Sequence, residues 1–327
     1  MSVEYGLTLT LLAFMLLAAW ALARSDDLLA AVMLAGIISL ASAAVFTVMD
    51  AVDVAFTEAA VGAGVATLLS VRALGVLGER RAAGRARVGL PFLVVLVCGG
   101  LLLYGTADLP AYGDPAAPAM QHVAPHYLAR GGVETGVPNI VTAVLASYRG
   151  FDTFGELVVI FTAGLGVLTL LAGSGVSGAR SEVDAGDRDI IVRQVVKWLV
   201  PFVLLFALYV QFHGDYGPGG GFQAGVIFAA GMVLYALTFG LPRLERVLPP
   251  SRLRLLAATG VWLYGGVGVA CLLRGGAFLD YAVLAEDAVD GQHLGILLVE
   301  LGVGLTVFSV MVLIYRAFTR QRHGGVE

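Results

Sequence analysis

The chain has 327 residues, of which 58% are apolar and only 13% are charged, and its mean hydropathy is +0.87. An ordinary globular domain carries about 25% charged residues, so this composition excludes a water-soluble fold and leaves only the membrane class. The net charge of −4 says little, because charge in a membrane protein matters by location rather than by sum.

Roughly 20 mostly apolar residues suffice for one helix to cross the hydrocarbon core, and such stretches recur along nearly the whole chain. They predict an all-α polytopic membrane bundle of about nine transmembrane helices plus one short interfacial helix. The expected spans are 5–23, 28–48, 52–71, 89–107, 153–172, 196–212, 219–240, 255–273 and 293–315. The first span has no basic segment before it, so we expect a retained helix and not a cleaved signal.

An odd number of spans places the two termini on opposite sides of the membrane. With these spans, all of the 20 basic residues except Arg130, Arg149 and Arg274 fall on one side. Because cytoplasmic loops carry the excess of Lys and Arg, the sequence predicts a cytoplasmic C-terminus and an external N-terminus in the cell (inner) membrane.

We expect three modules. Residues 1–80 hold three helices, residues 81–175 hold two helices with an external loop, and residues 176–327 hold four. The acidic, glycine-bearing segment 173–189 is the expected boundary before the last module. The external stretch 108–137 is rich in proline, which favours extended backbone over helix. After it, apolar residues at helical spacing over 138–149 predict the short interfacial helix.

Three acidic residues stand inside expected spans, where an ionised side chain costs at least about 2.5–3.5 kcal/mol. They are Glu58, Glu156 and Glu300, and each is accompanied by small residues that predict close helix packing. Two interpretations stay open for each acid. It is either a relay point for protons or cations, or a hydrogen-bonding contact that holds helices together.

Further candidates stand near the external ends of the spans. Asp53 begins the third span, where it is either a solvated rim residue or part of a cation-attracting funnel. His293 precedes Glu300 by two helical turns and shares its face. In the run 213–222, His213 and Asp215 could handle protons, although a histidine near a helix end is often structural. The triple glycine of this run permits a loop that folds back between helix ends and presents backbone amides or carbonyls: Gly219, Gly220 and Gly221.

Several kinds of chemistry find no support in the sequence. Cys98 and Cys271 stand singly in apolar runs without metal-ligand spacing, which predicts no iron–sulfur cluster, no zinc site and no cofactor. No catalytic triad or Cys/His arrangement is recognisable, so we expect no enzyme. Nothing indicates nucleic-acid binding.

On these motifs the chain resembles the Mrp (Mnh) multisubunit Na⁺/H⁺ antiporter and the related Mbh-type membrane arms. Residues 190–317, with HGDYGPGGGF at 213–222 and HLGILLVELGV at 293–303, are similar to the B subunit. The family loop usually reads His-Asn-x-Pro-Gly-Gly-Gly-Phe, and residues 214–217 replace part of it here. Residues 28–72, with DVAFTEAAVGAG at 53–64, resemble the MbhD-like tail of the large A subunit. Residues 139–171, with RGFDTFGE at 149–156, resemble the MbhE-like module that follows it.

The resemblance implies a fusion of the A-subunit tail with a B subunit, working in a complex that exchanges Na⁺ or another monovalent cation for protons. Implied partners are the antiporter-like A and D subunits and the small C, E, F and G subunits. Transported Na⁺ and H⁺ would be the only ligands. Two alternatives stay open: a membrane-arm subunit of a hydrogenase-like or complex I-like redox-driven pump, and a structural scaffold.

Overall fold

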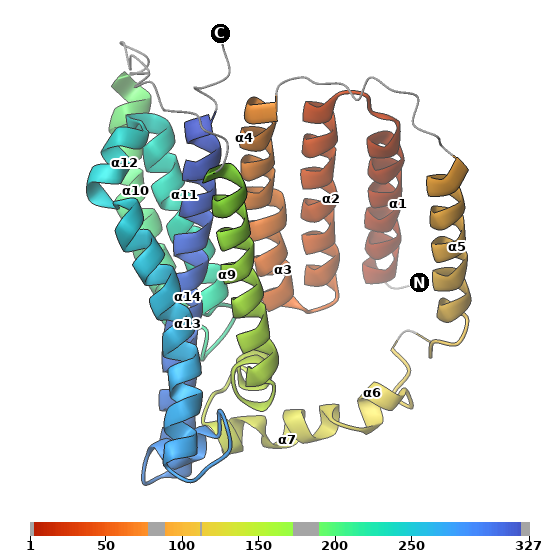
Figure 1. Ribbon diagram of the computed structural model, residues 1–327. Helices are drawn as coiled ribbons and strands as arrows, with labels where there is room; N and C mark the ends of the chain where they lie inside the picture. Colours follow the sequence, from red (N-terminus) through yellow and green to blue (C-terminus); the bar gives the residue numbers. More distant parts are fainter. Residues whose placement is uncertain (1–2, 78–88, 112, 173–189, 322–327) are drawn as a thin grey trace. The chain divides into compact units, whose positions relative to one another are not determined.

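The computed structural model describes residues 3–77, 89–111, 113–172 and 190–321, and this part of the chain is helical without strands (Figure 1). In it, η1 and η2 are π-helical and η3 is a 3-10 helix. The elements are α1 (Val3–Arg24), α2 (Leu28–Val48), α3 (Val52–Glu58), η1 (Ala59–Ala66), α4 (Thr67–Leu77), α5 (Gly89–Thr106), α6 (Pro118–Gln121), α7 (Ala124–Thr135), α8 (Ile140–Thr142), η2 (Ala143–Tyr148), α9 (Gly150–Ala172), α10 (Ile190–His213), α11 (Gly221–Phe239), α12 (Leu241–Val247), α13 (Pro250–Leu273), η3 (Tyr281–Leu284) and α14 (Ala288–Gln321).

The expected all-α membrane bundle is confirmed. Within the described ranges, nine helical stretches are long and apolar enough to cross a membrane, and each coincides with an expected span. The third of them runs continuously through α3, η1 and α4 over Val52–Gly75. Ends differ from expectation by a few residues, because helices continue into polar flanks that a hydropathy window leaves out.

The expectation of extended backbone throughout 108–137 is wrong, because α6 and α7 lie inside it. Pro118 stands at the start of α6 and Pro125 in the first turn of α7. At these positions the missing proline N–H would have no intrahelical partner anyway, and the fixed φ suits a helix. These two prolines therefore start helices instead of preventing them.

Contacts divide the described residues into two compact units, one made of residues 89–111 and 113–130 and the other of the remainder. Within the larger unit, α14 packs against α13, α11 and α9 (Figure 1). The N-terminal spans join it in sequence order: α1 packs on α2, α2 on α3, η1 and α4, and α4 on α14. The three-module division stays a prediction from sequence, and the expected boundary 173–189 lies outside the described residues.

Glycines set the closest approach between the helices of the larger unit. A Cβ on Gly260 would lie 2.3 Å from the Gly302 carbonyl oxygen, and a Cβ on Gly304 would lie 2.6 Å from Gln211 Oε1. Only small residues let helices approach this closely, so the predicted close packing beside Glu300 is confirmed. Beside Glu156 it is only partly confirmed, since a Cβ on Gly166 would meet nothing within 4 Å.

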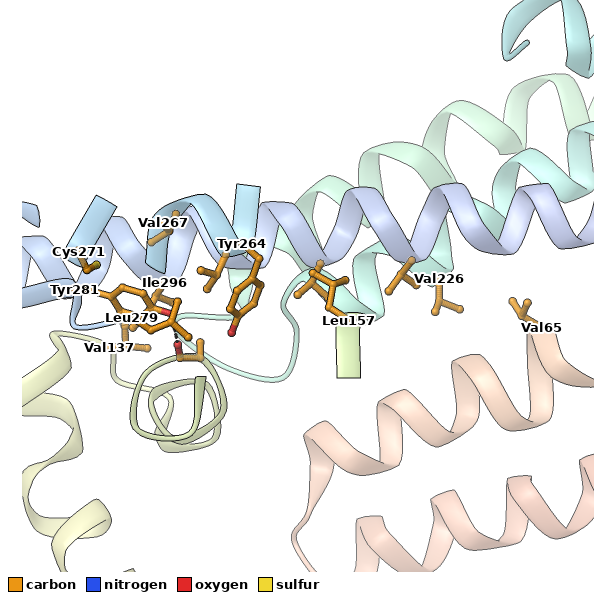
Figure 2. Close-up of a cluster of buried hydrophobic side chains, with 14 residues drawn as sticks. Val65, Val137, Leu157, Val226, Tyr264, Val267, Cys271, Leu279, Tyr281 and Ile296 are labelled. Carbon is orange, nitrogen blue, oxygen red and sulfur yellow. Dashed lines mark hydrogen bonds between the residues drawn. The ribbon is translucent and has the colours of Figure 1, made fainter. Parts of the chain in front are cut away.

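Two buried tyrosines fasten η2 and the start of α9 to the C-terminal helices. Tyr281 donates a hydrogen bond of 2.9 Å to the Ala146 carbonyl, and Tyr264 donates one of 2.8 Å to the Gly150 carbonyl. Figure 2 shows both rings in one cluster with Leu279, whose side chain also reaches Gly150. Burial raises the pKa of the Tyr281 hydroxyl above its ordinary value, so it remains a donor throughout the physiological range.

Candidate functional site

A cavity of about 230 Å³ in the larger unit is lined by residues of α3, α8, η2, α9, α11, α13 and α14. Three of the acids singled out in the sequence line it: Asp53 from α3, Glu156 from α9 and Glu300 from α14. The triple glycine, whose last member is the first residue of α11, lines it as well. Segments far apart in the sequence thus bring three carboxyl groups to one space.

The triple-glycine loop lies directly against two of these acids. The amide of Gly219 donates a hydrogen bond of 3.1 Å to Asp53 Oδ1, which joins the loop to the start of α3. Gly220 has φ of +107°, and a Cβ on it would lie 2.9 Å from Glu300 Oε1. A Cβ on Gly221 would lie 2.0 Å from the Glu300 carbonyl oxygen. The prediction that this loop folds back and presents its backbone is confirmed, and glycine is required at both positions.

The loop is held in place by residues that the sequence did not single out as functional. Asn139 Nδ2 donates to the carbonyls of Gly214 and Gly217 at 3.1 and 2.9 Å, and the Thr142 hydroxyl donates to Gly214 at 2.7 Å. Asn139 Oδ1 also accepts from the Val141 amide, which makes Asn139 the N-cap of α8. An asparagine before an apolar run signals a helix start, but its loop contacts leave no sequence signal.

Two further candidates, Asp215 and His293, form a pair outside the cavity lining. His293 Nε2 lies 3.1 Å from Asp215 Oδ2, and Asp215 is buried whereas His293 remains partly exposed. Burial raises the pKa of the Asp215 carboxyl, and the nearby His293 partly offsets this rise. The pair joins the loop to the start of α14.

The structure does not bring Glu58 or His213 to this cavity. The Ser39 hydroxyl donates a hydrogen bond of 2.6 Å to Glu58 Oε1, which links α2 to α3. This contact is the type expected if Glu58 holds helices together. The His213 ring stacks on Tyr209 with centroids 4.9 Å apart, and its Nε2 lies over Gly217. His213 therefore packs the base of the loop.

The expected interfacial helix over 138–149 appears as α8 and η2, with Pro138 just before the cap. Its small residues Thr142, Ala143 and Ala146 are buried against the bundle, whereas Val141 and Leu145 are exposed and line the cavity mouth. A location at the membrane surface stays a prediction.

The cavity suits the transient binding of a proton or a monovalent cation. Its inner wall includes the buried Leu157 and Val299, and no basic side chain lines it in the described part of the chain. A positive charge that balances the carboxylates therefore has to come from an ion or ligand that enters the cavity. Among the described residues there is also no cluster of three or more acidic, His or Cys side chains close enough to hold a metal ion. The carboxyl groups stand around the space instead of converging on one point.

Family models match three consecutive parts of the chain. A domain related to the MnhB subunit of Na⁺/H⁺ antiporter matches residues 191–313, the MbhD subunit of MBH matches residues 13–79, and the MbhE subunit of MBH matches residues 92–177. Together these models cover most of the chain in the order inferred from the motifs.

Known proteins agree with these models. A probable A/B subunit of a K⁺/H⁺ antiporter from Rhizobium meliloti is 28% identical over 68% of this chain, which spans about a quarter (24%) of that relative. A putative antiporter subunit mnhB2 of Staphylococcus haemolyticus is 33% identical over 41% of this chain and 96% of its own length. Both relatives are named as transporter subunits.

Two solved structures are similar as well. One chain of the Mrp complex from Dietzia sp. DQ12-45-1b matches with a TM-score of 0.75 and 27% identity, over 96% of this chain and 34% of that chain. Another, from the membrane-bound sulfane sulfur reductase, an archaeal respiratory membrane complex, matches with a TM-score of 0.54 and 26% identity, over 72% of this chain and 98% of that chain.

Proposed function

Because the chain belongs to the family of Mrp (Mnh) antiporter subunits, we propose that it is a membrane subunit of a monovalent cation/proton antiporter and that its cavity is one stage of the ion path. The observation that carries this proposal is the gathering of Asp53, Glu156 and Glu300 around one space from three different helices. Intramembrane acids are costly, and three at one place indicate a function beyond packing.

The exchange works through competition for the same carboxyl groups. A protonated carboxyl is neutral and tolerates apolar walls, whereas an ionised one needs a cation beside it. A proton and a Na⁺ or other monovalent cation therefore replace each other around the cavity. The Asp215–His293 pair exchanges protons with the external side, and His213 positions the loop between pair and cavity. No cofactor takes part in this exchange.

Antiporter-like A and D subunits and the small C, E, F and G subunits complete the path in the lipid bilayer. In the proposed orientation the C-terminus is cytoplasmic and the N-terminus external, because all but three of the 20 basic residues then fall inside. Reporter fusions at each terminus test this orientation, and a reporter active outside at the C-terminus would contradict it.

The test is neutralisation of single acids in the assembled complex, followed by cation/proton exchange in membrane vesicles. Glu300→Gln, Glu156→Gln and Asp53→Asn should each lower the exchange rate at least about tenfold, the equivalent of one charge-assisted contact. Asp152→Asn is the matched control, because Asp152 lies on α9 beside Arg149, is exposed and does not line the cavity. Normal exchange in all three variants would overturn the proposal.

Glu58→Gln answers a separate question. Glutamine can still accept the Ser39 hydrogen bond, so assembly should persist. If Glu58 relays ions, this variant loses antiport. If exchange is unchanged, Glu58 only joins α2 to α3, and the path consists of the cavity acids.

A redox-driven pump is a second candidate, favoured by the likeness to a respiratory membrane complex and to MBH subunits. Gentle purification with identification of the co-purifying subunits separates the two. Antiporter subunits alone support the first function, whereas cluster-binding redox subunits support the second. A pure scaffold would require exchange to survive loss of every cavity acid.

A further inference from the structure

Much of the cavity wall is apolar and offers no ligands to an inorganic cation that passes through. Half of its lining residues are aliphatic or aromatic, including the buried Leu157, Tyr264 and Val299. Inorganic cations take oxygen ligands, and aliphatic walls offer them none. The wall instead suits the apolar part of a larger ligand.

A polar end of the cavity lies near the triple-glycine loop. Gln223 is 7% exposed and lines the cavity. Its Oε1 lies 3.8 Å, and Glu300 Oε1 lies 2.9 Å, from the point that a Cβ on Gly220 would occupy. A ligand at this end can donate hydrogen bonds to the Gln223 amide oxygen and to the Glu300 carboxylate together.

The size and the entrance of the cavity define the ligand further. A dry cavity of about 150 Å³ holds one benzene molecule, so about 230 Å³ has room for one ring and a short polar arm. Val54, Val141 and Leu145 form an apolar mouth and are 46%, 37% and 47% exposed. With carboxyl groups on the lining and no basic side chain among its described residues, a positive arm is favoured over a neutral or negative one.

We propose that this cavity binds a small amphiphilic organic cation, an aromatic ammonium of about the size of benzylammonium, and that its occupancy blocks ion exchange. The ammonium lies between Glu300 and the Gln223 amide oxygen, and the ring lies on the apolar wall. The blocking step rests on the proposed ion path, whereas binding does not.

The test uses the purified complex in detergent and three probes that share one ring: benzylammonium, benzyl alcohol and benzoate. Calorimetric titration should show benzylammonium binding at least about tenfold more tightly than benzyl alcohol, because its contact to a carboxylate is charge-assisted, with benzoate weakest. Benzylammonium should also inhibit antiport in competition with the transported cation. Glu300→Gln should reduce the preference for benzylammonium over benzyl alcohol.

A pair of exposed-site variants locates the binding. Leu145→Trp fills the mouth and should weaken the binding of all three probes. Leu165→Trp, at a similarly exposed position on α9 away from the lining, should not. Equal affinity for the alcohol and the ammonium, or binding insensitive to Leu145→Trp, overturns the proposal and leaves the ion path untouched. Binding without competition overturns the blocking step. If antiport is unchanged when the cavity acids are neutralised, only the proposed ion path is refuted. The calorimetric titration still decides whether the cavity binds the organic cation.

Discussion

Replacing Asn139 by alanine removes three side-chain hydrogen bonds that join α8 to the triple-glycine loop. Two are donated to the carbonyls of Gly214 and Gly217, and the third caps α8. At about 1 kcal/mol for each bond, Asn139→Ala should lower the free energy of unfolding by about 3 kcal/mol. Because the loop places the Gly219 amide on Asp53, cation/proton exchange should fall as well.

The assay is unfolding in mixed micelles, together with exchange in vesicles. Asn139→Ser keeps a capping oxygen, but its side chain is too short to reach the loop carbonyls. Its free energy of unfolding should therefore fall by only about 2 kcal/mol. Asp27→Ala is the matched control, since Asp27 caps α2 by a bond of 2.8 Å to Leu29 and makes no contact with the loop. Asp27→Ala should lower the free energy of unfolding by about 1 kcal/mol and leave cation/proton exchange unchanged. If Asn139→Ala were no more destabilising than Asp27→Ala, the loop contacts would not stabilise the fold.

Two further predictions concern packing and pH. Gly221→Ala should lower the free energy of unfolding by more than the about 1–3 kcal/mol of ordinary overpacking, because its Cβ would meet the backbone of α14. Gly266→Ala is the control and should be neutral or stabilising, because a Cβ there would meet nothing within 4 Å. Equal unfolding curves for the two variants would contradict this prediction. Burial disfavours the ionised Glu245 carboxyl, but hydrogen bonds from Arg320 and Arg316 outweigh it and hold its pKa below the ordinary 4.5. This ion-paired cluster therefore stabilises the fold above pH 4.5 and loses its effect as the pH falls through the lowered pKa, so acid should destabilise wild type more than Glu245→Gln. If falling pH lowered the stability of wild type and Glu245→Gln by the same amount, that assignment would be refuted.

Hydropathy predicted the spans well because crossing a bilayer is a local property of about 20 residues. The same local reasoning nominated Glu156 and Glu300 as acids placed where charge is costly, and Asp53 as an acid near the external end of a span. It could not show that they share a cavity, since that depends on how α3, α9 and α14 pack. Nor could it separate them from Glu58, whose hydrogen bond comes from Ser39 on the neighbouring helix.

Other errors have similar causes. The proline-rich segment was expected to be extended because proline was counted by number and not by its place in the first turn of a helix. The role of Asn139 depends on a contact with residues more than 70 positions away in the chain. Gln223 carried a weak signal, as a polar residue next to the triple glycine, but only the fold shows that it lines the cavity.

Carbodiimide labelling of the assembled complex tests most directly whether the cavity acids exchange protons for cations. Hydrophobic carbodiimides react with protonated carboxyl groups in apolar surroundings, and mass spectrometry assigns the modified residue. We predict modification of Glu300 and Glu156, and protection of both by rising concentrations of the transported cation at constant pH. Modification that is the same with and without the cation, at a pH where the complex transports, would contradict the account.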